Sequence, residues 1–148
     1  METSYQELFR FLDQLGEKVE ELTALQQEKT AAVRRDDLLA VNDCMKREQV
    51  ISLSLRSMEK KREKLLGALQ LEGLPLSALT AHCPPELRPE ARAVVERLMG
   101  RYTVYRSAAT VSRNTLEINL HEIEKQIARH EGRAAAEQPG GPLADIRA

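Results

Sequence analysis

The chain has 148 residues and a formal net charge of −1, a balance that excludes a global field drawing it to nucleic acid or to an anionic membrane. Aromatic residues make up 3% of the chain and charged residues 30%. Such a composition, rich in Leu, Ala, Glu, Lys, Arg and Gln, favours long helices and coiled-coil packing over sheets. The length suits one domain.

Three features of the sequence indicate a cytoplasmic protein. No stretch approaches the roughly 18 consecutive apolar residues that a membrane-spanning helix needs. The N-terminus, which reads Met1-Glu2-Thr3, lacks the basic-then-apolar layout of a signal peptide. Cys44 and Cys83 are too few for a disulfide framework. We therefore expect a protein of the reducing cytoplasm with no membrane insertion.

The first predicted helix covers residues 5–33. Ser4 and Glu7 have the spacing of a capping box at its start. Its apolar positions then recur in steps of four and three, as in a coiled-coil seam, at Leu8, Leu12, Leu15, Val19 and Leu22. Gly16 falls off this seam, so we expect it to face solvent.

The run Arg34-Arg35-Asp36-Asp37 predicts the end of this helix and the start of a second. Basic residues suit a helix C-terminus and acidic residues the next N-terminus, so Asp36 or Asp37 is the expected N-cap. One uninterrupted helix is the alternative, since neither Gly nor Pro interrupts the run.

The second predicted helix covers residues 37–70. Its seam is Val41, Cys44, Glu48, Ile51, Leu55, Met58, Arg62, Leu65 and Leu69. Because Glu48 and Arg62 are charged, each needs a partner or must bend out to solvent. Residues 71–87 contain several prolines and a glycine and form a connector, in which residues 77–81 can make one helical turn.

The third predicted helix covers residues 88–131, begins at Pro89 and ends before Gly132. We interpret it as the element around which the chain is organised, because it carries the steadiest apolar repeat. The first row of that repeat is Leu98, Tyr102, Tyr105, Ala109, Ser112, Leu116, Leu120, Ile123 and Ile127. A second row, roughly 100° around the helix, is Val104, Ala108, Val111, Thr115 and Ile118.

These elements predict an all-α fold. An antiparallel helical hairpin and a long third helix form an elongated three-helix coiled-coil-like bundle, in which the third helix overhangs the hairpin. The helical domain covers residues 1–132. Residues 133–148, rich in Ala, Pro and Gly and without a repeating apolar row, are expected to form a disordered, flexible tail.

The sequence contains no recognisable pattern of a catalytic residue, a metal site or a cofactor site. His82, His121 and His130 are scattered, and Gly140-Gly141 has no following helix to make a phosphate loop. The basic residues between positions 60 and 64 are interspersed with Glu59 and Glu63, which argues against nucleic-acid binding. The sequence therefore predicts a protein that is not an enzyme.

The second row of the third helix is the predicted partner-binding surface. Helices one and two can cover the first row while a partner helix lies on Val104, Ala108, Val111, Thr115 and Ile118. In the alternative interpretation both rows pack inside the three-helix core, one row against each neighbour.

The organisation of the chain resembles a known family. Glu28-Lys29 lies in the leading helix, the acidic break is Asp36-Asp37-Leu38-Leu39, and Asn114-Thr115-Leu116 lies in the last helix. The second helix carries Lys46-Arg47-Glu48 and the run from Leu55 to Leu66. Over residues 5–130 this layout resembles the FlgN family of flagellar export chaperones.

The resemblance implies a small cytoplasmic chaperone. Such a protein binds the C-terminal region of the hook-associated proteins of the hook–filament junction, keeps them unpolymerised and delivers them to the flagellar type III export apparatus. A self-associating structural coiled-coil protein and a helical chaperone for another client, such as the filament-cap protein, are the alternatives.

Overall fold

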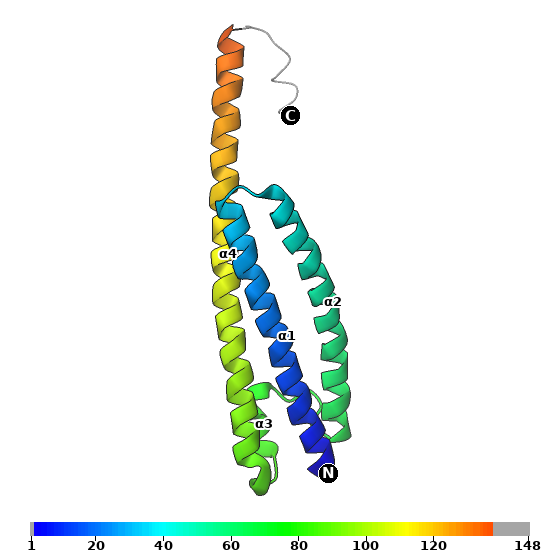
Figure 1. Cartoon of the computed structure of the whole chain (residues 1–148). Helices are drawn as coiled ribbons and strands as arrows, with labels where there is room; N and C mark the ends of the chain where they lie inside the picture. Colours follow the sequence, from blue (N-terminus) through cyan, green and yellow to red (C-terminus); the bar gives the residue numbers. More distant parts are fainter. Residues whose placement is uncertain (1, 138–148) are drawn as a thin grey trace.

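The computed structural model describes the backbone of residues 2–137 and the side chains of residues 2–132. Three long helices make up most of this part of the chain, and it contains no strand; the helices are α1 (Glu2–Arg34), α2 (Leu38–Ala68) and α4 (Arg88–Glu137). Figure 1 shows α2 running antiparallel to α1, while α4 runs parallel to α1 and extends past the turn that joins α1 to α2. The predicted all-α fold, with its overhanging third long helix, is confirmed.

The helix at the centre of the molecule is α1, which lies between α2 and α4 (Figure 1). It packs against both of them, whereas α2 and α4 make few direct contacts with each other. Buried side chains consequently lie around much of the circumference of α1; its buried residues are Tyr5, Leu8, Phe9, Phe11, Leu12, Leu15, Gly16, Val19, Leu22, Thr23, Leu25, Gln26, Lys29, Thr30, Ala32 and Val33. The prediction that the last helix organises the chain is wrong, because burial depends on the number of neighbouring helices and not on the length of an apolar row.

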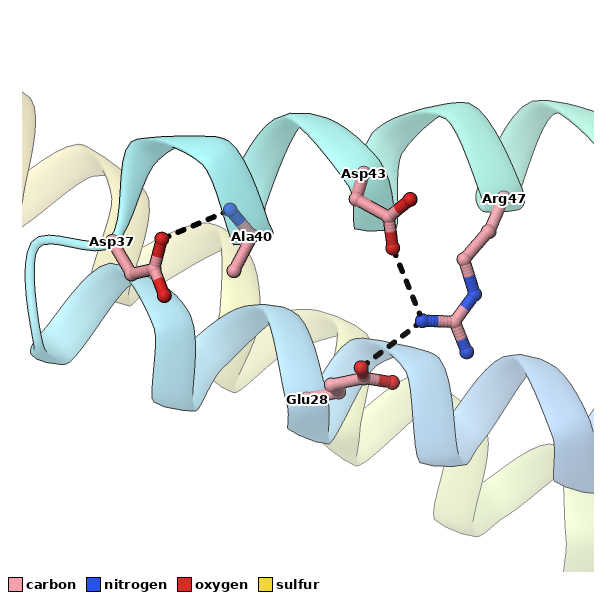
Figure 2. Close-up of polar contacts among 5 residues, drawn as sticks. All are labelled: Glu28, Asp37, Ala40, Asp43 and Arg47. Carbon is pink, nitrogen blue, oxygen red and sulfur yellow. Dashed lines mark hydrogen bonds and ion pairs between the residues drawn. The ribbon is translucent and has the colours of Figure 1, made fainter.

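The turn between α1 and α2 separates the two helices at residues 35–37. Asp37 is the N-cap of α2, and its Oδ1 accepts a hydrogen bond from the Ala40 backbone N at 3.1 Å (Figure 2). This bond satisfies one of the backbone donors that the first turn of a helix leaves without a partner. Asp36 adopts a φ of 56°, a left-handed conformation that Asp tolerates better than most residues do.

Two charged contacts join α1 to α2 below this turn. Arg47 Nη1 lies 3.0 Å from Glu28 Oε1 and 3.5 Å from Asp43 Oδ2, on the surface of the hairpin (Figure 2). Lys29 Nζ lies 2.6 Å from Glu48 Oε1 in a more buried position. The charged seam residue Glu48 therefore finds its partner on the facing helix.

The second charged seam residue of α2, Arg62, finds its partner on its own helix. Arg62 Nη2 lies 3.3 Å from Glu59 Oε2, one turn earlier. Its side chain lines a narrow pocket together with Leu8 and Leu12 of α1. Arg62 thus covers apolar surface with its stem while its head reaches a carboxylate, as long basic side chains often do.

Two arginines of α4 join it to α1 in the part of the bundle far from the turn between α1 and α2, which is the lower part in Figure 1. Arg97 forms a bidentate ion pair with Asp13, in which Nε donates to Oδ1 at 3.1 Å and Nη2 donates to Oδ2 at 3.0 Å. Arg101 Nε donates to Glu20 Oε1 at 2.9 Å, and Arg101 Nη1 donates to the Asp13 carbonyl at 3.3 Å.

Gly16 lies directly beneath the Arg101 side chain, because a Cβ on Gly16 would stand 2.9 Å from Arg101 Cδ. The prediction that Gly16 faces solvent is wrong, because the residue is buried. Since Gly16 has no side chain, the Arg101 side chain can pass over α1 at this point and reach Glu20.

The connector closes the lower end of the bundle with three short helices, η1 (Leu76–Ala78), α3 (Leu79–His82) and η2 (Pro85–Leu87). Leu79, Cys83 and Leu87 of this segment are buried in the same core cluster as Leu12 of α1 and Leu98 of α4. The expected helical turn at residues 77–81 is found within η1 and α3.

The helix α4 continues through Gly132 to Glu137, whereas the sequence predicts its end at Glu131. A single glycine inside a helix costs only about 1 kcal/mol relative to Ala, so Gly132 alone does not terminate the helix. Residues 138–148 of the predicted tail lie outside the described residues.

Candidate partner-binding site

The first apolar row of α4 is buried only where the hairpin lies beside it. Leu98 and Ser112 are buried, whereas Leu120, Ile123 and Ile127 are exposed. The change occurs where Asn119 Nδ2 donates to Asp36 Oδ1 at 3.2 Å, a contact that marks the level of the turn between α1 and α2. From Asn119 to Glu137, α4 extends about 27 Å further, at 1.5 Å per residue, and no other described helix lies beside this part (Figure 1).

The three large side chains of the second row are exposed. Val104 is 55%, Val111 44% and Ile118 67% exposed. Ala108 and Thr115 lie half-buried between them. The alternative in which both rows pack inside the core is therefore wrong, because α1 packs on the first row and no other described helix covers the second.

A shallow groove between α1 and α4 runs along this second row. Its upper part is a hollow of about 470 Å³ that Val104, Ala108 and Val111 line from the α4 side. The opposite wall belongs to α1. The complete lining of the upper hollow is Gln27, Thr30, Arg34, Thr103, Val104, Ser107, Ala108 and Val111.

The groove continues downward into a second hollow of about 440 Å³, which shares Gln27 and Val104 with the first. Its complete lining is Glu20, Thr23, Ala24, Gln27, Glu96, Arg97, Gly100, Arg101 and Val104. Thr115 and Ile118, the upper members of the predicted site, line neither hollow and extend the row past them.

The α1 wall of the groove was missed by the sequence analysis. Its members are polar or small and fall outside the apolar seam, so hydrophobic periodicity does not select them. The available signal was an absence of charge among the α1 residues that line the groove between Glu20 and Arg34, which are Thr23, Ala24, Gln27 and Thr30.

The described residues form neither a reactive thiol nor a metal site. Cys44 and Cys83 are buried, and burial raises the pKa of both thiols, which disfavours the reactive thiolate. Among the described residues no group of three His, Cys, Asp or Glu side chains could hold a metal ion. Within residues 2–137, no helix is long and apolar enough to cross a bilayer.

The fold and this surface together define a class: a helical protein that offers an apolar row and a groove to a partner. A model of the FlgN protein family matches residues 1–138. The chain belongs to the FlgN family, a family of flagellar export chaperones rather than of enzymes. Comparisons with curated proteins and with solved structures gave no match.

Proposed function

We propose that this protein is a cytoplasmic chaperone that binds the C-terminal region of the hook-associated proteins of the hook–filament junction. It keeps these subunits from assembling early and delivers them to the flagellar type III export apparatus. Membership of the FlgN family supports the chaperone role. The observation that carries the site assignment is the exposure of the large side chains of the second row of α4, Val104, Val111 and Ile118.

The mechanism is mutual burial of two apolar helical faces. Burial of apolar surface stabilises a complex by about 25 cal/mol per Å², so a row of this size can contribute several kcal/mol before ordering costs. A protein that must release what it delivers is suited by micromolar to nanomolar binding, which corresponds to about 8 to 12 kcal/mol of net binding free energy, so contacts beyond this row must contribute as well. No metal or cofactor takes part in such a cycle.

The test compares two double variants that introduce the same charges at different surfaces. Val111→Asp with Ile118→Asp alters the second row, whereas Val50→Asp with Leu53→Asp alters an exposed apolar patch on α2. We expect the first to weaken capture of a purified junction protein by more than about tenfold in biolayer interferometry, because two charges must then be buried at the interface. The α2 variant should bind like the wild type.

Circular dichroism provides the folding control for both variants. If the Val111→Asp, Ile118→Asp protein stays helical and still captures the junction protein with wild-type affinity, the site assignment is wrong. Measuring the filament-cap protein in parallel decides between the two classes of client.

A second candidate function is self-association as a structural coiled-coil protein. The observation that favours it is the row Leu120, Ile123 and Ile127, which is exposed and has the spacing of a coiled-coil seam. Sedimentation of the purified chain separates the two functions. A monomer that captures a junction protein supports the chaperone, and a tight dimer that captures none supports the scaffold.

A further inference from the structure

The groove between α1 and α4 is more apolar than its composition suggests. Three of its threonines already donate their hydroxyl hydrogens to backbone carbonyls of their own helices. Thr23 Oγ1 donates to Val19 O at 3.0 Å, and Thr30 Oγ1 donates to Gln26 O at 2.9 Å. On the α4 side, Thr103 Oγ1 donates to Met99 O at 3.0 Å. An apolar occupant would therefore leave none of these donors unsatisfied.

The charges along the groove differ between its two ends. In the lower part, Arg97 and Arg101 are paired with Asp13 and Glu20, and Glu96 has no ion-pair partner among the described residues. In the upper part, Arg34 is the only charged residue of the lining, and it forms no ion pair within the part of the chain that the structure describes. Among the described residues, the groove thus carries one unpaired positive charge near the turn, on Arg34, and one unpaired negative charge near its base, on Glu96.

We propose, given the function proposed above, that the groove binds a single amphipathic helix of the client in one orientation. The apolar face of that helix lies on Val104, Ala108 and Val111, with α1 as the second wall. Its C-terminal end, which carries the negative end of the helix dipole and an acidic group, lies beside Arg34. Its N-terminal end lies toward Glu96. The distance from Arg97 to Val111 on α4, about 21 Å at 1.5 Å per residue, fits about four turns of helix.

The first test asks whether the α1 wall takes part in binding. Gln27 is exposed and lines both hollows, so Gln27→Trp fills the groove without altering α4. Gln14 is exposed on another flank of the same helix, where it lines a separate pocket with Arg10 and Lys61, and Gln14→Trp is the matched control. The probe is a fluorescently labelled C-terminal segment of a hook-associated junction protein. We expect Gln27→Trp to weaken binding at least tenfold and Gln14→Trp to change it less than twofold.

The second test asks for the orientation. Arg34→Glu should weaken binding of the same segment about threefold, as expected for one exposed ion pair. Arg10→Glu makes the same charge change at an exposed α1 position outside the groove and should have no effect. Replacing an acidic residue near the C-terminal end of the client helix by Lys should restore binding to the Arg34→Glu protein. The same replacement near the N-terminal end should not.

The outcomes separate this inference from the function on which it rests. If the wild type binds the segment but Gln27→Trp binds equally well, the groove assignment is wrong and the chaperone function stands. If only a replacement near the N-terminal end of the client restores binding to Arg34→Glu, the proposed orientation is wrong. If the wild type captures no junction protein, the proposed function fails and this inference fails with it.

Discussion

The two parallel helices α1 and α4 both carry repeating apolar rows, but these rows are used differently. Sixteen of the 33 residues of α1 are buried, because α2 packs on one flank of this helix and α4 on another. Among the described residues, the longer α4 packs closely against α1 and the connector, and beyond Asn119 it extends past the turn of the hairpin (Figure 1). A regular apolar row therefore stabilises the fold only where a second helix reaches it.

The same comparison distinguishes a folding surface from a binding surface. In α1 the apolar side chains are enclosed, and even Lys29 is largely buried. In α4 the second row and the upper part of the first row remain in solvent. Matched substitutions in the two helices test this difference directly, and three pairs follow in order of expected effect.

The largest difference is expected for leucine truncation. Leu15 of α1 is 1% exposed, so Leu15→Ala should lower the free energy of unfolding by about 3 kcal/mol through lost burial and a residual cavity. Leu120 of α4 is 57% exposed, and Leu120→Ala should change it by less than about 0.5 kcal/mol. Urea unfolding followed by circular dichroism measures both. Similar losses in the two variants would mean that the upper part of α4 is packed in solution.

A smaller difference is expected for two lysines that each pair with a glutamate. The Lys29 side chain is 10% exposed and that of its partner Glu48 is 23% exposed, so Lys29→Met leaves a largely buried carboxylate without a cation. We expect a loss of about 2 kcal/mol. Lys125→Met removes the exposed partner of Glu122 on α4 and should cost less than about 0.5 kcal/mol.

The double variant Lys29→Met, Glu48→Met provides the control for the buried pair. Because it replaces both charges by apolar side chains of similar length, it should recover most of the lost stability. If the single Lys29→Met variant is as stable as the wild type in thermal unfolding, the ion pair is not buried in solution.

The smallest difference is expected for two helical glycines. Nothing lies within 4 Å of a Cβ built on Gly100 of α4, so Gly100→Ala should stabilise the protein by about 0.5–1 kcal/mol. The same change at Gly16 of α1 would displace Arg101 from Glu20 and from the Asp13 carbonyl, which offsets the gain in helix propensity. Equal stabilisation by both variants, measured by thermal unfolding, would show that Arg101 moves aside at no cost.

Much of the fold could be predicted from periodicity and capping residues, because these are local properties of the chain. The three long helices, the break before Asp37 and the overhang of the last helix all follow from such signals. The burial of Gly16 could not, since its cause is the Arg101 side chain of a helix 85 positions later in the sequence. Likewise, nothing local indicates that Glu48 meets Lys29.

For the candidate site, one wall could be predicted from the sequence. The spacing of Val104, Ala108, Val111, Thr115 and Ile118 places them on one face of a helix whatever the rest of the chain does. The packing of the helices leaves the large side chains of this face exposed and brings Gln27 and Arg34 of α1 beside it to complete a groove, and neither follows from the spacing. The physical reason is that exposure depends on where neighbouring helices end and pack, which is a property of the assembled molecule.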